Sequence, residues 1–313
     1  MKIFQLALFF SLILVSSVAC KKRKVEKAAT KMQEFIIEIS KSARSTDPNF
    51  IIIPQNGPEL LFNNGNEEDG LNTNLIPYVN AFGMEELFYD GGEVTDSYRY
   101  DLIKRSGVKV LVADYHSNNT NIVNSYTKSN EENWIAFPRS TDNYDYKYIP
   151  TSIFNENGSN ITNLDQAKNY LYLISTDNFL TKSSYLNSLD ATNYDVLIID
   201  AFFGDSLLTL SEVNSLKTKA NGGQRLVIAY MNIGSAEKFR YYWESDWRKG
   251  KPNWLKKKYD GYDDEIWVEF WEQEWKDIIF GNNESYTKKL IDAQFDGAYL
   301  DNVEAFYFLY HRK

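Results

Sequence analysis

The run Val196-Leu197-Ile198-Ile199, which ends on Asp200, decides the fold class of this chain. Four apolar residues in succession are typical of a strand that is covered on both faces, as in a parallel sheet flanked by helices. Seven more short apolar runs lie on either side of it, at residues 50–53, 81–84, 108–113, 134–137, 170–174, 226–230 and 297–300. The sequence therefore predicts an α/β protein with eight buried strands.

Helical patterns lie between several of these runs, for example at residues 211–220 and 286–293. The clearest one precedes Asp47-Pro48 and places its apolar residues on a single helix face, at Met32, Phe35, Ile36, Ile39 and Ala43. Eight strands with interleaved helices predict a (β/α)8 TIM barrel that forms a single domain over residues 27–313. An open, doubly wound sheet is the alternative that strand counting leaves open.

The first 26 residues are expected to lie outside the folded domain. Residues 1–19 combine a positive start, an apolar core and small residues, so they predict a signal peptide. Cys20, the only cysteine, sits in a pattern that resembles a bacterial lipobox, although Ser17 stands at the usual leucine position. We therefore expect a lipidated Cys20, a basic tether over residues 20–26 near anionic headgroups, and an exported protein anchored at the bacterial cell envelope. A soluble secreted protein with an incidental cysteine is the alternative.

Composition excludes several kinds of chemistry. The chain has 34 Lys and Arg residues against 43 Asp and Glu, and an acidic chain without a basic stripe argues against nucleic-acid binding. His116 and His311 are the only histidines, and the single cysteine leaves neither a Cys-rich zinc site nor a thiol nucleophile. Glycine-rich nucleotide-binding motifs are also missing. We therefore expect no metal and no cofactor, and acid–base chemistry carried by Asp, Glu or Tyr.

Acidic and amide residues follow the predicted strands where each one ends. In chain order they are Asn56, Glu85, Glu86, Asp114, Asp200, Glu237 and Asp301. The carboxyl ends of all strands in a β/α barrel meet at one mouth, where the active site lies. Burial and repulsion there separate the pKa values of neighbouring carboxyls, so that two of them can take opposite roles. Single residues of this kind often cap a helix instead, but several on successive strands favour a two-carboxylate glycoside hydrolase.

Six of the seven tryptophans lie between Trp243 and Trp275. Aromatic rings can stack on the apolar faces of sugars and bury large areas. The simpler interpretation, which we favour for most of these rings, is that they pack a long insertion onto the barrel. One or two of them are expected to line the cleft.

Five strings resemble signatures of one known family. They are residues 229–243 (AYMNIGSAEKFRYYW), 295–303 (FDGAYLDNV), 50–57 (FIIIPQNG), 83–89 (GMEELFY) and 110–115 (VLVADY). Together they are similar to the glycoside hydrolase family 114 superfamily, whose type activity is endo-α-1,4-polygalactosaminidase. The resemblance implies a TIM barrel that cleaves an α-linked polysaccharide containing galactosamine.

The resemblance also implies roles for individual residues. It places the catalytic acids at Asp301 and Glu85, with Glu86 as the register alternative to Glu85, and it does not say which acid is the nucleophile. Substrate-binding residues are then expected around this pair, at Asn56, Glu86, Asp114, Asp200, Tyr230, Glu237, Arg240 and Asn302. An acidic cleft would favour a polymer with free amino groups. We expect a monomer whose partners are the polysaccharide and, through Cys20, a membrane.

The order of these segments differs from the order in the family. There, the segments that correspond to residues 229–243 and 295–303 come first, whereas here they come last. This order predicts a circular permutation, which a closed sheet with nearby termini tolerates. It requires the strand at 50–53 to pair with the strand at 297–300. The competing functions are a non-catalytic carbohydrate-binding lipoprotein and a structural envelope protein with the Trp-rich segment as its partner surface.

Overall fold

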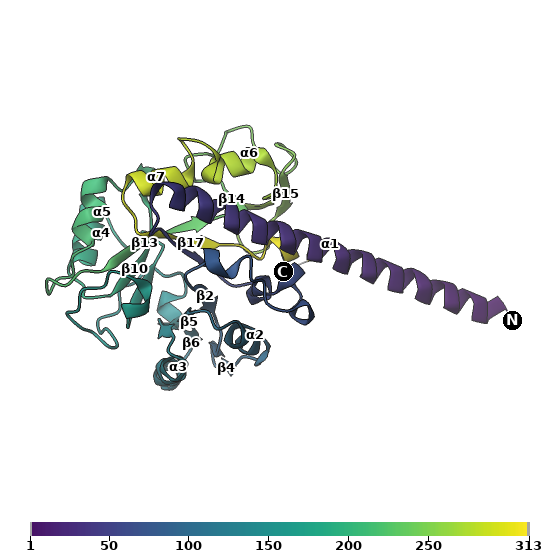
Figure 1. Ribbon diagram of the computed structural model, residues 1–313, viewed down its shortest axis with the longest axis horizontal. Coiled ribbons are helices and arrows are strands. Elements are labelled where there is room, and N and C mark those ends of the chain that lie inside the picture. The colour runs from purple at the N-terminus through teal and green to yellow at the C-terminus, as the bar shows by residue number, and fades with distance from the viewer. Residues whose placement is uncertain (1, 312–313) are drawn as a thin grey trace.

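The structure is a computed structural model that describes residues 2–311, with side chains described for residues 20–311 apart from Asn119. The predicted signal peptide, residues 1–19, therefore falls where no side chain is described. The backbone begins with a long helix, α1 (Lys2–Thr46), whose amino-terminal part extends away from the rest of the molecule (Figure 1). Cys20 is exposed on this helix. None of the helices in the described part has the length and apolar character that a membrane span needs.

The second half of α1 packs onto the domain as the sequence predicts. The helix ends at Thr46, directly before Asp47-Pro48, because proline disfavours the helical conformation of the residue that precedes it. The five residues of the predicted apolar face are all fully buried: Met32, Phe35, Ile36, Ile39 and Ala43. The amphipathic pattern is thus confirmed.

All eight predicted strands are present, and they are parallel to one another. Five form a sheet in the order β1-β17-β13-β10-β9, and three form a sheet in the order β2-β5-β7. A parallel bridge between Gln55 and Gly83 joins β1 to β2. The strands therefore follow one another in space as β9 (Tyr170–Leu173), β10 (Val196–Asp200), β13 (Leu226–Asn232), β17 (Gly297–Asp301), β1 (Ile51–Pro54), β2 (Phe82–Glu85), β5 (Val110–Ala113) and β7 (Ile135–Ala136).

The pairing that the permutation hypothesis requires is present. β1 lies beside β17 in parallel register, from Ile51 opposite Gly297 to Pro54 opposite Leu300. The first and last of the eight strands along the chain are therefore neighbours in the sheet. The order of the strands relative to the family remains a hypothesis.

The prediction of a closed barrel is not confirmed, and the fold that is shown is mixed α/β. Within residues 2–311, no strand ladder joins β7 to β9, the two ends of the spatial order. The sheet nevertheless curls, because side chains of distant strands meet. The ring of Tyr172 on β9 lies 5.2 Å from that of Tyr299 on β17, three strands away. Across the open seam, the ring of Phe137, which follows β7, lies 5.7 Å from that of Tyr170 on β9.

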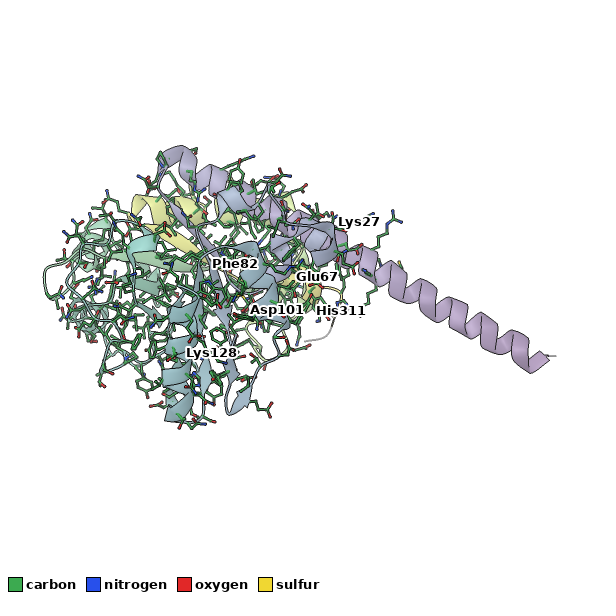
Figure 2. The ribbon with its side chains drawn as sticks, turned by 60° about the horizontal axis from the view of Figure 1, so that its bottom comes forward. Lys27, Glu67, Phe82, Asp101, Lys128 and His311 are labelled. Carbon is green, nitrogen blue, oxygen red and sulfur yellow. The ribbon has the colours of Figure 1, made fainter. Side chains whose placement is uncertain are left out.

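Helices surround the strands. In Figure 1, α1, α6 and α7 lie along one side of the molecule, α4 and α5 along a second, and α2 and α3 along a third. Their bounds are α2 (Tyr98–Ser106), α3 (Asn119–Glu131), α4 (Lys182–Asp190), α5 (Leu210–Leu216), α6 (Gln273–Lys276), α7 (Tyr286–Asp292) and α8 (Ala305–Phe308). The carboxyl end returns to the first helix, so that His311 and Lys27 lie near each other in Figure 2.

The Trp-rich segment forms a separate antiparallel sheet after β13. Its strands are β14 (Ser235–Glu237), β15 (Leu255–Lys258) and β16 (Glu265–Val268), in the order β14-β16-β15. Trp254, Trp267 and Trp275 are buried, and the other three tryptophans of the segment are partly buried against the same core. The prediction that most of these rings pack the insertion is therefore confirmed.

Three short two-stranded pairs complete the fold. They join β3 (Tyr89–Asp90) to β4 (Glu93–Val94), β6 (Tyr115–His116) to β8 (Arg139–Ser140), and β11 (Phe202–Phe203) to β12 (Ser206–Leu207). The β6–β8 pair is parallel and continues the β5–β7 ladder toward the carboxyl ends of the strands. It thereby carries Arg139 to the edge where the predicted site residues lie.

Candidate active site

Asp301 and Glu85 end two strands that are separated by a single strand. Asp301 is the last residue of β17 and Glu85 the last of β2, and β1 lies between them. With adjacent strands about 4.8 Å apart, the two backbone positions are separated by roughly 10 Å across the sheet. The two carboxylates also interact electrostatically, because burial and then the charge of Glu85 raise the pKa of Asp301 to about 6.

Two hydrogen bonds hold the carboxylate of Asp301. The hydroxyl of Tyr230, on the neighbouring strand β13, donates to Oδ2, and the backbone N–H of Asn302 donates to Oδ1 at 2.6 Å. Both bonds favour the charged form and lower the pKa, but the burial of the group outweighs them. The predicted residues Tyr230 and Asn302 are therefore direct neighbours of the predicted catalytic acid.

A separate set of donors holds Glu85. The hydroxyl of Tyr146 donates to Oε1, and the amide of Asn56 donates to Oε2 at 3.2 Å. Arg99 on α2 braces this arrangement, since its Nη2 donates to Asn56 Oδ1 at 2.6 Å and its Nη1 to the carbonyl of Glu85 at 3.0 Å. Asn56 thus contacts Glu85, one of the two predicted catalytic acids, while Arg99 and Tyr146 were not predicted.

Glu86, the register alternative, is engaged elsewhere. Its Oε1 forms an ion pair with Nη2 of Arg139 at 3.0 Å, and Arg139 also donates from Nη1 to the carbonyl of Ala113 at 2.7 Å. Burial raises the pKa of Glu86, and the charge of Arg139 opposes that rise. Arg139 therefore pairs with Glu86, whereas the donors to the Glu85 carboxylate are the neutral side chains of Tyr146 and Asn56.

The backbone is unusual at the same edge of the sheet. Asn56, Glu86 and Asn302, which follow the ends of β1, β2 and β17, have φ angles of 61°, 51° and 59°. Residues other than glycine rarely adopt this left-handed conformation, and it concentrates at functional sites. Three such residues on three adjacent strands mark this edge as the candidate site.

Asp200, Glu237 and Arg240, all predicted to bind substrate, contact one another. Arg240 Nε donates to Glu237 Oε2 at 2.7 Å, and Arg240 Nη1 donates to Asp200 Oδ1 at 2.8 Å. All three side chains are buried. Their contacts in this structure are those of a buried ion-pair cluster at the carboxyl ends of β10 and β14.

The prediction that Asp114 lines the cleft is contradicted by its burial. Asp114 is fully buried, and its Oδ1 accepts the backbone N–H groups of Phe88 and Tyr89 at 2.9 and 3.3 Å. Its Oδ2 accepts the hydroxyl of Ser125 at 2.5 Å. The residue therefore fixes the segment that follows Glu85 and Glu86, which is the structural role that a strand-end aspartate often has.

Glu265 is the main acidic residue that the sequence analysis missed. It lies on β16, and burial, followed by the charge of Glu237, raises its pKa to about 8. The charge of Asp301 contributes to the same rise. The only available signal was the acid at the head of the apolar run Ile266-Trp267-Val268, and that run belongs to the antiparallel insertion instead of a parallel strand.

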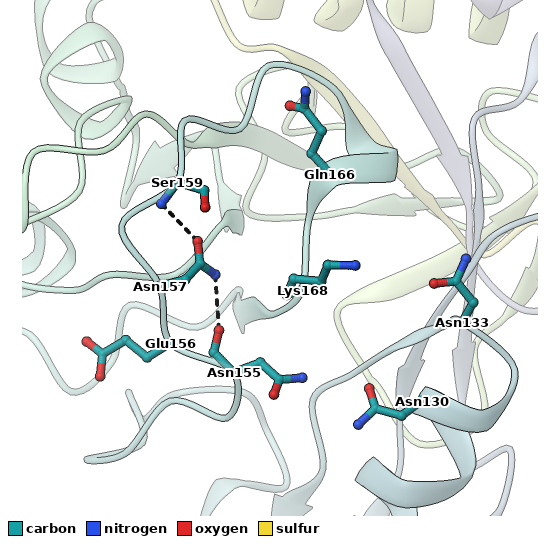
Figure 3. Close-up of a pocket in the computed structure, with 8 residues that line it drawn as sticks. All are labelled: Asn130, Asn133, Asn155, Glu156, Asn157, Ser159, Gln166 and Lys168. Atoms are coloured by element: carbon teal, nitrogen blue, oxygen red, sulfur yellow. Dashed lines mark hydrogen bonds between the residues drawn. The ribbon is translucent and has the colours of Figure 1, made fainter.

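Two surface hollows differ in their relation to these residues. The smaller one, about 200 Å³, adjoins the candidate site and is lined by Glu86, Leu87, Asp90, Thr95, Asp96 and Arg99. The larger one, about 580 Å³, is lined by amides and Lys168 and lies before the starts of β7 and β9, at the opposite end of the strands (Figure 3). Among the described residues, no group of three or more His, Cys, Asp or Glu side chains could hold a metal ion.

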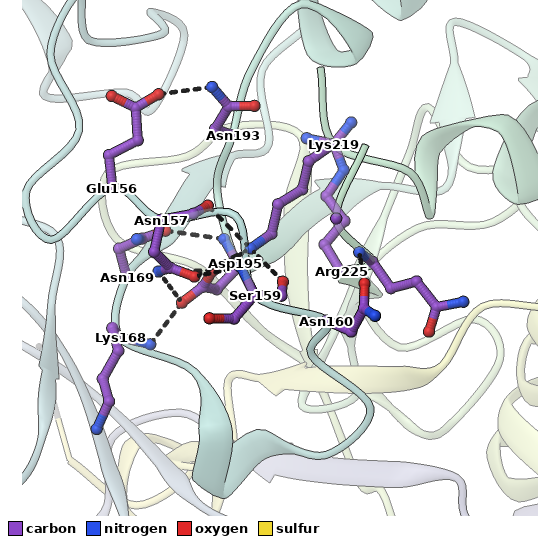
Figure 4. A network of polar contacts seen from close by, with 12 residues as sticks. Glu156, Asn157, Ser159, Asn160, Lys168, Asn169, Asn193, Asp195, Lys219 and Arg225 are labelled. Atoms are coloured by element: carbon purple, nitrogen blue, oxygen red, sulfur yellow. Dashed lines mark hydrogen bonds and ion pairs between the residues drawn. The ribbon is translucent and has the colours of Figure 1, made fainter. Parts of the chain in front are cut away.

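A buried ion pair organises the loops near the larger hollow. Lys219 Nζ lies 2.6 Å from Asp195 Oδ1, and neither side chain is exposed to solvent. Asn157 donates from Nδ2 to the same carboxylate, and the backbone N–H of Lys168 donates to Asp195 Oδ2 at 2.7 Å (Figure 4). These groups satisfy one another, so they tie the loop at residues 155–160 to the starts of β9, β10 and β13.

The fold and the candidate site together define an α/β protein with carboxylates gathered at the carboxyl ends of parallel strands, the usual place of active sites in such folds. Within this class, residues 170–312 match the model of glycoside-hydrolase family GH114. The resemblance stated from the sequence is thereby confirmed for this part of the chain.

Curated relatives each match less than half of the chain. An uncharacterized protein of Methanocaldococcus jannaschii is 32% identical over 151 residues, which are 48% of this chain and 41% of the relative. An uncharacterized protein of Thermotoga maritima is 30% identical over 118 residues, 38% of this chain and 35% of the relative. The chain therefore spans less than half the length of these relatives.

Proposed function

We propose that this protein is an exported glycoside hydrolase that cleaves an α-linked, galactosamine-containing polysaccharide with Asp301 and Glu85 as its two carboxylates. The observation that carries the proposal is the position of these two acids, which end β17 and β2 with only β1 between them, in a chain whose residues 170–312 match family GH114. A pair of carboxyls that flanks one glycosidic bond is the usual equipment for this reaction.

In the proposed mechanism, one carboxyl protonates the leaving oxygen while the other attacks the anomeric carbon or activates water. The raised pKa of Asp301, about 6, allows this group to exchange a proton near neutral pH. Tyr146 and Asn56 fix Glu85, and Tyr230 and Asn302 fix Asp301. The separation of the two carboxyls during turnover decides between retention and inversion.

The scaffold that we propose for this activity is a closed (β/α)8 barrel in permuted order. Two contacts across the β7–β9 seam support closure. The rings of Phe137 and Tyr170 lie 5.7 Å apart, and the N–H of Ile174, next to β9, donates to the carbonyl of Tyr146 at 3.1 Å. The β1–β17 pairing supports the permuted order.

We also propose that the protein acts as a monomer at the cell envelope, anchored through Cys20. The exposed thiol of Cys20 and the exposed basic residues 21–24 support this placement. The acidic balance of the chain and the carboxylates of the candidate site suit a polymer with free amino groups.

The proposal is tested by incubating the purified protein with partly deacetylated α-1,4-polygalactosamine and with other envelope glycans, beside Asp301→Asn and Glu85→Gln. We expect new reducing ends from the wild type only. Rescue of alanine variants by azide, with the anomer of the azide product determined by NMR, assigns the nucleophile and the acid. Equal product from wild type and Asp301→Asn would remove the catalytic assignment. Binding of a glycan without cleavage would favour the non-catalytic alternative.

A further inference from the structure

Glu265 occupies the centre of a hydrogen-bond network beside Asp301. Its Oε2 accepts from the hydroxyl of Ser235 at 2.5 Å, from Nδ2 of Asn232 at 3.2 Å and from Nδ2 of Asn302 at 3.4 Å. One carboxylate oxygen therefore joins the end of β13, the start of β14 and the residue that follows β17. Glu265 itself is supplied by β16, whose register places it opposite Glu237.

Asn302 connects this network to the proposed catalytic acid. Its backbone N–H donates to Asp301 Oδ1 at 2.6 Å, and its Nδ2 also donates to the hydroxyl of Ser235 at 3.2 Å. The residue has a left-handed φ of 59°, so it depends on its surroundings to hold this conformation. Packing is tight at this point, because a Cβ added to Gly234 would lie 1.8 Å from the carbonyl oxygen of Asn302.

We propose that Glu265 is a positioning residue for Asp301, acting through the side chain of Asn302. The proposal rests on the proposed function only in taking Asp301 as a catalytic acid. Glu265 holds the amide of Asn302, the amide fixes the turn after β17, and the turn aims a backbone N–H at Asp301 Oδ1. A small error in the placement of a reacting group costs a large part of the rate, so such a brace affects turnover more than binding.

The protonation state of Glu265 fits this role. Burial, then the charge of Glu237, raises its pKa to about 8, and a proton on Oε1 leaves the three bonds to Oε2 unchanged. The groups that interact with it electrostatically are the carboxylates of Glu237, Asp264 and Asp301 and the hydroxyls of Tyr230, Tyr242, Tyr259 and Tyr262. Arg240 neutralises Glu237. Near neutral pH, Glu265 can thus brace Asn302 without adding a full charge beside Asp301.

Three variants test the proposal: Glu265→Ala, Glu265→Gln and Asn302→Gly, with Glu244→Gln as an exposed control on the same insertion. Glu265→Ala is expected to lower kcat by about tenfold or more with KM nearly unchanged. Glu265→Gln retains an acceptor oxygen for Asn302 and is expected to keep most of kcat near pH 7. In Asn302→Gly the glycine tolerates the left-handed backbone, and kcat should fall as much as in Glu265→Ala. The double variant Glu265→Ala/Asn302→Gly should have a kcat no lower than that of either single variant.

A second readout is independent of catalysis. The pKa of Asp301 is measured by NMR titration of its carboxyl carbon in the wild type and the variants. Glu265→Ala and Asn302→Gly should both raise it, since the N–H that stabilises the charged form is no longer held in place, while Glu265→Gln and Glu244→Gln should leave it nearly unchanged. Identical titrations of Asp301 in all variants, or additive losses in the double variant, would overturn the positioning role. If the wild type is inactive but the pKa of Asp301 still rises in Glu265→Ala and Asn302→Gly, the proposed function is refuted and the positioning role stands.

Discussion

The acidity of Asp301 depends on two opposing effects, and Tyr230 controls one of them. Burial and the charge of Glu85 favour the neutral carboxyl, whereas the hydroxyl of Tyr230 donates to Oδ2 and favours the charged form. Replacement of Tyr230 by Phe removes that donor. The pKa of Asp301 should then rise from about 6 by about one unit, the equivalent of about 1.4 kcal/mol. NMR titration of the Asp301 carboxyl measures the change, and the matching inflection in the pH–rate profile should move to higher pH.

Tyr185→Phe is the matched control, because the buried hydroxyl of Tyr185 has no hydrogen-bond partner among the described residues. The same titration has a consequence for stability. The pKa of Asp301 is about 6 in the folded protein, against an ordinary pKa of 3.8. The free energy of unfolding therefore falls as the pH rises from about 3.8 to about 6. Tyr230→Phe should extend that decline to higher pH. An unchanged pKa of Asp301 in Tyr230→Phe would contradict this account.

Arg99 is expected to matter through the shape of its guanidinium. One nitrogen reaches Asn56 and another the carbonyl of Glu85, and a lysine ammonium cannot reproduce this planar fork. Arg99→Lys should therefore lower kcat/KM by about tenfold or more while the thermal midpoint changes little. Arg105→Lys, an exposed position on the same helix, is the control. Equal kinetics of the Arg99 and Arg105 variants would exclude the positioning role.

At the scale of residues, the sequence predicts a site residue only where an acidic or amide side chain follows the end of a predicted strand. Asp301 and Glu85 follow apolar runs of parallel strands, and for this reason the pattern finds them. Arg99 lies on a surface helix and Tyr146 in an irregular loop, so neither carries a positional signal. Asp114 lies at a strand end as predicted, but it is buried and holds a loop. Burial of a strand end depends on which distant segments pack over it, and the neighbouring sequence does not contain that information.

Among the elements, the ends of β10 and β14 carry a buried ion-pair cluster. Arg240 pairs with both Glu237 and Asp200, whose side chains are 4% and 13% exposed. Arg240→Met should leave two buried carboxylates unpaired and lower the free energy of unfolding by about 3–5 kcal/mol. Urea denaturation at pH 7 measures the loss. It should shrink at lower pH, because the pKa of Glu237 is already raised by burial and rises further without Arg240.

Two comparisons make this prediction specific. Lys289→Met breaks an ion pair with Glu284, which is 87% exposed, and should cost under about 1 kcal/mol. Combining Arg240→Met with Glu237→Gln and Asp200→Asn should recover part of the lost stability, since no unpaired charge remains. If Arg240→Met loses little stability but binds glycan more weakly, these residues have the substrate-binding role expected from the sequence.

β2 must approach β17 closely across the curled sheet, and Gly83 permits it. A Cβ at this position would lie 1.8 Å from the hydroxyl of Tyr299, which itself contacts Tyr172. Gly83→Ala should therefore strain this packing and destabilise the protein by about 1–3 kcal/mol. Gly92→Ala is the control, because its Cβ would meet only the Ser117 hydroxyl, at 3.2 Å. Equal unfolding midpoints for both variants would argue against close packing inside the sheet.

The eight strands were predictable because each is buried on both faces and so forms an unbroken apolar run. The α1 face was predictable because its apolar residues share one side of the helix. The antiparallel sheet β14-β16-β15 was not, since its strands carry Lys256, Lys257 and Glu265 among aromatic residues and lack a clear alternation. Closure across β7 and β9 depends on contacts between distant segments, which local patterns do not encode.

For the whole molecule, the decisive question is whether its order of strands is a permutation of a closed ring. The carboxyl end lies beside α1, since Lys21 on this helix interacts electrostatically with His311 and Figure 1 shows the carboxyl end next to the helix. The exposed stretch Thr151-Ser152 lies between the two halves. The loop at 155–160 that follows it is tied to Asp195 and Lys219, and so belongs to the second half.

A rearranged chain tests whether the two halves can be exchanged in order. It starts at Ser152, runs to His311, continues through a short Gly/Ser linker into Lys27 and ends at Thr151, so that its strands follow in the order proposed for the family. The cut lies between β7 and β9, which share no strand ladder among the described residues, so the cut and the new joint change no strand contact. If the order of the two halves is interchangeable, the thermal midpoint should lie within a few degrees of the parent. The control opens the chain between Ile198 and Ile199, inside β10, and should not fold. Failure of the Ser152 variant to fold, with a linker long enough to span the termini, would mean that the halves are not interchangeable in order.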